Sequence, residues 1–290
     1  MFDHIAETIP YQNIAYSTDV HLTIKRLDLI HPHISGNKFY KLKNNLSYAQ
    51  QLGCTHILTF GGAYSNHIAA TAYAAHLFGF QSIGIIRGDE LAHQPLNPTL
   101  QQAQQYGMQL QFVTRADYRK RHDAEYLHYL QNQWSNCYII PEGGSNALAI
   151  QGCQDILSNA DLQNFDVICC AVGTGGTISG LIERSTVQQH VLGFSALKGD
   201  FLQDEIRQWT DKSNWSLTDA YCGGGYAKTS AELLNFIENF QRDYAIPLEP
   251  IYTGKMMMGI FDLIQQGYFS KHTRILAIHS GGLQGWNQSI

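Results

Sequence analysis

Two short segments of the sequence carry residues suited to holding a phosphate group and a reactive amine. The first, Gly173-Thr-Gly-Gly-Thr177, follows the apolar run Asp166–Val172 and precedes a helical pattern at Ile178–Glu183. Glycines in such a turn let backbone N–H groups converge beside the positive end of a helix dipole, which favours phosphate binding. No Gly-Lys-Ser/Thr follows, and Ile178 stands where a dinucleotide fingerprint has its third glycine. Taken alone, the loop is also compatible with a plain strand-to-helix turn.

The second segment is Ser35-Gly-Asn-Lys38, which directly precedes a helical pattern beginning Phe39-Tyr-Lys41-Leu42. An isolated lysine is usually a solvated surface residue. Lys38, however, follows a glycine at a strand-to-helix junction and has neighbours that would bury it. A lysine held beside a phosphate site is what covalent binding of pyridoxal 5′-phosphate (PLP) requires. The two segments together predict a PLP-binding lysine at Lys38, with Lys41 and Lys255 as alternatives.

Three more loops combine glycine with small polar side chains after an apolar run. They are Gly61-Gly-Ala-Tyr-Ser65-Asn66-His67, Glu142-Gly-Gly-Ser145-Asn146 and His279-Ser280-Gly-Gly282. Ser65 and Asn66 are ordinary helix caps in one interpretation. In the other, their hydroxyl and amide groups join free backbone donors to bind a carboxylate. Ligands of open α/β sheets bind where the strands end, so we expect these loops to meet at one site.

The elements that must position these loops follow from the alternation of apolar runs with helical periodicity. Strands are predicted at residues 56–60, 82–86, 110–113, 138–140, 166–172 and 275–278, and helices at 68–78, 98–106, 149–157, 178–183, 233–240 and 257–264. Thr229-Ser-Ala-Glu232 predicts a capping box ahead of the helix that begins near Leu233. The alternation predicts an α/β fold with open, mainly parallel sheets flanked by helices.

Composition narrows the possible classes of protein. The 290 residues are 44% hydrophobic and only 15% charged, which indicates one or two domains with a real core. A net charge of −5 without charged runs argues against nucleic-acid binding, and no apolar run reaches the ~18 residues of a membrane span. No signal peptide is recognisable and the six cysteines form no Cys-x-x-Cys pair, so a cytoplasmic protein with reduced cysteines is expected. The His31-Pro-His33 pair has no third ligand nearby, and no metal site is expected.

In their order along the chain, these loops resemble the PLP-dependent family that contains 1-aminocyclopropane-1-carboxylate (ACC) deaminase and D-cysteine desulfhydrase. The resemblance covers nearly the whole chain. It also includes Ile24-Lys-Arg-Leu-Asp28, Gly224-Gly-Tyr226 and Pro250-Ile-Tyr252-Thr-Gly-Lys255. Each motif alone is weak, whereas the ordered set is highly specific. The resemblance implies PLP fold type II, with a large domain at residues 1–40 and 148–290, a small domain at 41–147, and a homodimer.

The same resemblance implies a role for each matching residue. Lys38 would bind PLP covalently and Ser280 would face its pyridine nitrogen. Asn66 would bind the ring hydroxyl. The phosphate would lie on Gly173, Thr174, Gly175, Gly176 and Thr177. Ser65, Tyr226 and Tyr252 would surround a small amino-acid substrate and share the catalytic site with Lys38.

Several positions depart from the family pattern. Tyr64 replaces a glutamine, Gly224 a proline and Ala227 a glycine, and the chain is some tens of residues shorter than typical members. Thr253 follows Tyr252 where ACC deaminases have glutamate and D-cysteine desulfhydrases have threonine, and His67 also matches the desulfhydrase pattern. Threonine cannot ionise to assist the opening of the ACC ring.

The sequence therefore predicts a PLP-dependent lyase that eliminates a β-substituent from a small D-amino acid and yields a 2-oxo acid and ammonia. ACC deaminase is the alternative within the same family. From another class, a PLP-carrying binding or regulatory protein with little turnover is disfavoured, because Ser65, Tyr226 and Tyr252 are retained. A nucleotide-binding α/β protein would need an acidic ribose partner, and none is evident between Val191 and Gly199.

Overall fold

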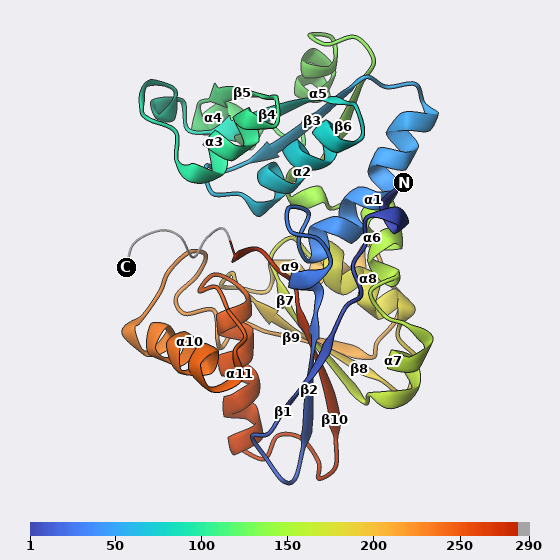
Figure 1. Cartoon of the computed structure of the whole chain (residues 1–290), viewed down its shortest axis with the longest axis vertical. Helices are drawn as coiled ribbons and strands as arrows, with labels where there is room; N and C mark the ends of the chain where they lie inside the picture. Colours follow the sequence, from blue (N-terminus) through green and yellow to red (C-terminus); the bar gives the residue numbers. More distant parts are fainter. Residues whose placement is uncertain (284–290) are drawn as a thin grey trace.

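The computed structural model of the chain describes residues 1–283, which form two mainly parallel sheets (Figure 1). The six-stranded sheet has the order β1 (Tyr11–Ile14), β2 (His21–Arg26), β10 (Arg274–His279), β7 (Val167–Val172), β8 (His190–Ser195) and β9 (Trp215–Thr218). The four-stranded sheet has the order β5 (Met108–Val113), β4 (Gln81–Arg87), β3 (His56–Gly61) and β6 (Cys137–Ile140). Among these strands, only β1 pairs antiparallel to its neighbour. The predicted α/β class with two parallel sheets is confirmed.

Helices surround both sheets, and the two sheets occupy opposite ends of the molecule in Figure 1. The helices are α1 (Asn37–Gln51), α2 (Asn66–Leu77), α3 (Pro98–Gln105), α4 (Arg115–Arg119), α5 (Ala124–Gln131), α6 (Ala147–Gln154), α7 (Asn159–Asn164), α8 (Gly176–Arg184), α9 (Phe201–Arg207), α10 (Ala231–Tyr244) and α11 (Thr253–Gln265). Helix α6 packs against both α1 and α8. This group of helices lies between the small sheet and the large one (Figure 1). No helix within residues 1–283 is long and apolar enough to cross a membrane.

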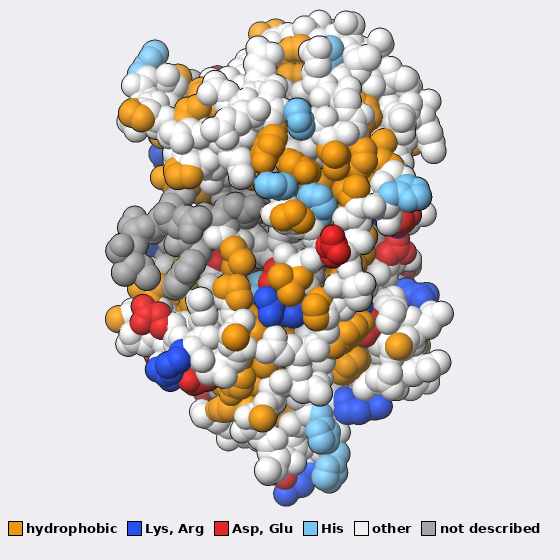
Figure 2. All heavy atoms as spheres, viewed as in Figure 1, with side chains coloured by type: hydrophobic (Ala, Val, Ile, Leu, Met, Phe, Trp, Pro, Cys, Tyr) orange, Lys and Arg blue, Asp and Glu red, His pale blue; other side chains and the backbone are white. Residues whose placement is uncertain are grey.

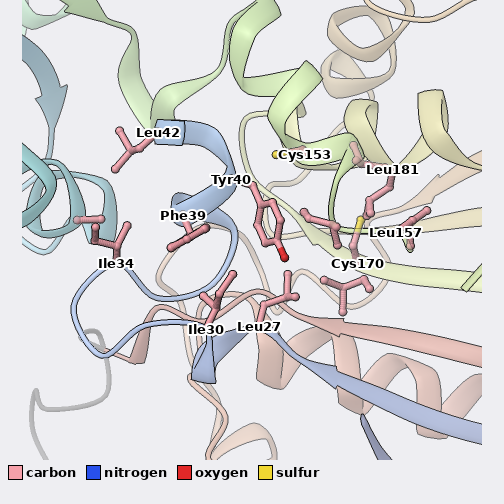
Figure 3. Close-up of a cluster of buried hydrophobic side chains, with 14 of the residues drawn as sticks. Leu27, Ile30, Ile34, Phe39, Tyr40, Leu42, Cys153, Leu157, Cys170 and Leu181 are labelled. Atoms are coloured by element: carbon pink, nitrogen blue, oxygen red, sulfur yellow. The ribbon is translucent and has the colours of Figure 1, made fainter. Parts of the chain in front are cut away.

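The position of β7 between two layers of helices explains why its sequence is apolar without alternation. Ile168 and Cys170 belong to a core cluster shared with α1, α6 and α8, whereas Cys169 and Ala171 belong to a second cluster shared with α10 and α11. Both faces of the strand are therefore buried, as in other parallel sheets covered on two sides. Figure 3 shows part of the first cluster, in which Cys153 and Cys170 lie among leucine, isoleucine and aromatic side chains. All six cysteines are free thiols.

The four strands of the small sheet lie within the segment 41–147 that the resemblance assigns to the small domain. The expected boundary after residue 40 falls inside α1, which runs continuously from Asn37 to Gln51. The domain limits therefore stay a prediction.

Five of the six predicted helices begin within two residues of the predicted start, but one cap is misplaced. Asn97 caps α3 as its Asn-Pro sequence predicts, because its side chain accepts from the N–H of Leu100. The predicted capping box at Thr229 is wrong. Ser230 is the N-cap of α10, and its hydroxyl accepts from Leu233 N at 3.2 Å. Ser and Thr are both good caps, so the local sequence does not distinguish adjacent positions.

Histidine and tyrosine rings join the loop before α1 to helices α2 and α3. His33 stacks on Tyr73 with 4.3 Å between ring centroids, and Tyr106 contacts both rings. Nδ1 of His31 accepts from the backbone N–H groups of His33 and Ile34. Figure 2 shows histidine and hydrophobic side chains side by side where the two ends of the molecule meet. These contacts therefore fix the loop before α1 against α2 and the end of α3.

Candidate active site

The loops chosen from the sequence are linked at the carboxyl ends of β3, β7 and β10. Asn37 makes two of the links, because its backbone N–H donates to the carbonyl of Ser280 at 3.0 Å and its amide donates to Thr177 Oγ1 at 2.8 Å. The Asn66 amide donates to the carbonyl of Gly282 at 3.1 Å. Gly36 packs so tightly on this junction that an added Cβ would lie 1.8 Å from the Ser280 oxygen. These contacts bring the start of α1, the phosphate loop and the Ser280 loop together.

Lys38 differs from the two alternative lysines in how its ammonium group is bonded. Its Nζ contacts only the Asn37 side chain, at 3.1 Å, among the described residues. Lys41 Nζ donates to Gly143 O and Ser145 Oγ, both at 2.9 Å, and lies 3.4 Å from Thr174 Oγ1. Lys255 Nζ donates to the carbonyls of Cys222 and Gly225. Among the three amines, that of Lys38 therefore makes the fewest hydrogen bonds.

Electrostatics also favour a neutral amine at Lys38. Burial, followed by the nearby Lys41 cation, lowers the pKa of Lys38 to about 7. A like charge and a poorly hydrated setting both disfavour protonation of an amine. An uncharged lysine amine is the nucleophilic form, so the lowered pKa of Lys38 favours its reactive form.

Donor groups that suit an anion gather where Lys41 meets the Gly173–Thr177 loop. Ser145 Oγ lies 2.6 Å from Thr174 Oγ1, and both lie beside the buried Lys41 ammonium group. Added Cβ atoms would lie 2.6 Å from Ser145 Oγ at Gly176 and 3.0 Å from the Tyr252 ring at Gly173. An ammonium group, two hydroxyls and the start of α8 are a donor set that suits a phosphate.

Asn66 and Ser65 lie at the start of α2. Oδ1 of Asn66 is buried and has no hydrogen-bond partner within residues 1–283. Buried acceptors are normally paired, so this oxygen can receive a bond from a ligand hydroxyl. The hydroxyl of Ser65 accepts from Ile68 N at 3.3 Å and is a helix cap. The cap leaves its proton available to a substrate oxygen.

Ser280 is fixed by the residue that precedes it. Its neighbour His279 is buried, donates from Nε2 to Pro247 O at 2.7 Å and accepts from Gly281 N at Nδ1. Burial lowers the pKa of His279. A neutral hydroxyl at Ser280 would not hold a ring nitrogen protonated as a carboxylate would.

Two tyrosines pack together beside the Gly173–Thr177 loop, where the Tyr252 ring lies against Gly173. The rings of Tyr226 and Tyr252 meet edge to face with 6.1 Å between their centroids. Burial raises the pKa of Tyr252 well above its usual value, so its hydroxyl stays protonated. Thr253 is fully buried, and its hydroxyl lies 3.1 Å from a carboxylate oxygen of Glu249.

Lys41, Ser145 and Glu249 are the site residues whose roles the sequence analysis missed. The sequence indicates Lys41 only as an alternative for covalent attachment, and Ser145 only as part of a polar loop. Glu249 carries no motif by itself. Its carboxylate accepts from the backbone N–H groups of Ile251, Tyr252 and Thr253, a geometry that the folded turn creates.

Comparison with known proteins agrees with this site. The family model described as pyridoxal-phosphate dependent enzyme matches residues 4–281. A Thermotoga maritima protein provisionally named 1-aminocyclopropane-1-carboxylate deaminase is 29% identical over 90% of this chain and 88% of its own. A Yersinia pestis D-cysteine desulfhydrase is 26% identical over 97% of this chain and 93% of its own. A solved structure described as an ACC deaminase homologue has a TM-score of 0.83 and 25% identity, covering 97% of this chain and 91% of that one.

The chain belongs to the pyridoxal-phosphate dependent enzyme family. The predicted enzyme class, its PLP cofactor and the resemblance to ACC deaminase and D-cysteine desulfhydrase are confirmed. The residues present also fit the cofactor, because an anion pocket, an unpaired buried acceptor and a weakly bonded lysine lie around one junction. The part that each residue plays toward PLP stays a prediction.

Gly175→Asp is expected to weaken PLP retention at least about tenfold more than Gly175→Asn. Gly175 has a φ of 77°, a conformation that Asn and Asp both tolerate better than most residues, so the pair differs mainly in charge. Two unit charges about 4 Å apart repel by ~4 kcal/mol at an effective dielectric constant of about 20. Absorbance after dialysis measures retained PLP and thermal unfolding controls for stability. Equal retention by the two folded variants would show that no phosphate lies at this loop.

Proposed function

We propose that the protein is a PLP-dependent lyase that eliminates the β-substituent of a small D-amino acid, with D-cysteine as the model substrate. The single observation that carries the proposal is the contrast between Lys38 and Lys41. One amine has its pKa lowered to about 7 and has a single side-chain contact, and the other is bonded into an anion pocket. The similarity to a D-cysteine desulfhydrase supports this choice of substrate.

In this proposal, Lys38 would hold PLP covalently, Lys41 with Ser145 and Thr174 would bind its phosphate, and Asn66 would accept from its ring hydroxyl. Ser280 would face the ring nitrogen, and the backbone of Gly173, Gly175, Gly176 and Thr177 would complete the phosphate site. Bound PLP supplies an electron sink for the charge that develops at the substrate Cα when its proton leaves.

The reaction itself would use groups of this chain on the substrate side. Ser65 binds the carboxylate with its free hydroxyl proton. The substrate amino group would displace Lys38 from PLP, and the freed Lys38 amine would then take the Cα proton, a step for which a pKa near 7 suits neutral pH. Tyr226 and Tyr252 enclose the β-carbon, from which the thiolate departs. Addition of water then yields pyruvate and ammonia.

Thr253 makes ACC the poorer substrate in this proposal. Its hydroxyl is already engaged in the cap around Glu249, so it offers no ionisable group for ring opening. A general acid or base typically contributes about 10²–10⁴-fold, and ACC turnover should be lower by a factor of this order.

The test compares pyruvate formed from D-cysteine or β-chloro-D-alanine with 2-oxobutanoate formed from ACC, at equal enzyme and with L-cysteine as control. We expect the D-amino acids to be turned over on the order of 10²-fold faster than ACC. Thr253→Glu alone should not restore ACC turnover, because a second carboxylate would lie against Glu249. Faster turnover of ACC would refute the proposal in favour of ACC deaminase, and no turnover by PLP-loaded protein would favour a binding protein.

We further propose a homodimer in the cytoplasm, with a small domain at residues 41–147 and a large domain from the rest, as the resemblance implies. Light scattering during size-exclusion chromatography should give twice the mass of 32.5 kDa. A monomer mass would contradict the dimer.

A further inference from the structure

Lys255 is a buried ammonium group that the proposed chemistry does not use. It is 2% exposed and lies in the first turn of α11. A cation in this position is unfavourable, because the first turn carries the positive end of the helix dipole. Burial also disfavours the charged form of Lys255 and lowers its pKa. A group held at such a cost needs strong hydrogen-bond acceptors.

Those partners are two carbonyl oxygens of the glycine-rich loop at residues 222–227. Lys255 Nζ donates to Cys222 O at 2.7 Å and to Gly225 O at 2.9 Å. The side chain also passes along Gly223, where an added Cβ would lie 3.3 Å from Lys255 Cε. The same two carbonyls accept the backbone N–H groups of Gly225 and Lys228. These two hydrogen bonds define two successive turns of the loop, and the Lys255 ammonium group binds a carbonyl in each.

The loop has little else to define its shape. Gly223, Gly224, Gly225 and Ala227 all have positive φ, and Ala227 is the one of them that pays a steric cost for it. Tyr226 lies between these residues, is 48% exposed and reaches the ring of Tyr252. The position of Tyr226 therefore depends on the conformation of a segment that is intrinsically flexible.

Glu249 holds the start of α11, the helix that carries Lys255. Its buried carboxyl group accepts from the N–H groups of Ile251, Tyr252 and Thr253. It also lies near the Lys255 ammonium group, and burial raises the pKa of Glu249. One turn of α11 thus fixes Tyr252 directly and reaches the Tyr226 loop through Lys255.

We propose that Lys255 is a positioning residue whose ammonium group holds the 222–227 loop so that Tyr226 faces the substrate. This inference rests on the proposed function in assigning Tyr226 to the substrate site. Lys255 touches neither substrate nor cofactor and acts through the loop alone. Its removal should weaken amino-acid binding and leave PLP retention unchanged.

The first test is limited proteolysis by trypsin, followed by mass measurement of the fragment that ends at the exposed Lys228. Lys255→Met removes the ammonium group and keeps the length of the side chain. Losing hydrogen bonds from a charged group should speed this cleavage about 10- to 100-fold. Lys255→Arg, which retains charge and donors, should cleave within a few-fold of wild type, and the exposed Lys271→Met is the control for loss of a surface charge. Unchanged cleavage of Lys255→Met would overturn the proposal.

The second test measures binding of D-alanine, which has no β-leaving group, by titrating the visible spectrum of the PLP-loaded protein. Lys255→Met should raise the dissociation constant about tenfold, and Tyr226→Ala should raise it similarly. The double variant should be no worse than Tyr226→Ala, because the two residues act as a unit. Additive losses would overturn the proposal.

Both readouts are independent of turnover, so they stand whether or not D-cysteine is a substrate. If Lys255→Met fails to fold, Lys255→Gln takes its place, since it is polar, lacks the charge and retains N–H donors. It should give faster cleavage than wild type, and wild-type cleavage would count against the proposal.

Discussion

Lys38→Ala is expected to lose the visible absorbance band of lysine-bound PLP and to lower turnover by on the order of 10³-fold or more. The variant lacks both the group that holds the cofactor covalently and the proposed acceptor of the Cα proton. The residues proposed to bind the phosphate are unchanged in this variant, so some PLP should still bind. That PLP would lack the covalent bond to lysine that borohydride reduces. Spectra taken before and after borohydride reduction measure the attachment, and pyruvate formation measures turnover.

Lys41→Ala and Lys255→Ala are the matched controls, since they remove the two alternative lysines. Both should retain a band that is lost on reduction, provided that PLP is supplied in excess. Loss of the band from either control, with its retention in Lys38→Ala, would contradict the assignment.

Lys41→Met is expected to raise the dissociation constant of PLP about 10- to 100-fold, the equivalent of ~1.5–3 kcal/mol for a hydrogen bond to a charged group. The ammonium group lies between Ser145 and the phosphate loop, and no other lysine or arginine donates to Thr174 within residues 1–283. Lys43→Met, on the same helix, is the control, because Lys43 forms salt bridges with Asp3 and Asp155 and with no other carboxylate within residues 1–283.

The same variant carries a pH signature. Lys41 is one cause of the lowered pKa of Lys38, so its removal should raise that pKa above about 7. The neutral amine is the form that captures PLP, so the rate of PLP uptake should rise with pH and level off above the pKa of Lys38. The midpoint of this profile should move to higher pH in Lys41→Met. An unchanged midpoint would show that Lys41 does not influence the amine.

The fold was predictable because parallel sheets leave a strong local signal. The run from Asp166 to Val172 is apolar without alternation, since α1, α6 and α8 cover one face of β7 while α10 and α11 cover the other. The misplaced cap at Thr229 has the opposite cause. Two neighbouring hydroxyl residues satisfy the same local rule, and only tertiary packing selects Ser230.

The site was predictable only where glycine motifs mark a turn beside a strand. Gly173–Thr177 and the glycines around Lys38 and Ser280 are such turns. The role of Lys41 was not predictable in this way, because it depends on Gly143 and Ser145, which lie about a hundred residues further along the chain. Glu249 differs, because its partners lie only two to four residues further along the chain, but they are backbone N–H groups, which the residue types do not reveal.

The central claim is that PLP is held by Lys38, and one measurement tests it most directly. The PLP-loaded protein is reduced with borohydride and digested, and the peptide that carries the cofactor is identified by mass spectrometry. A modified residue at Lys38, in the peptide that contains Phe39 and Tyr40, is the predicted result. Modification at Lys41 or Lys255 would contradict it.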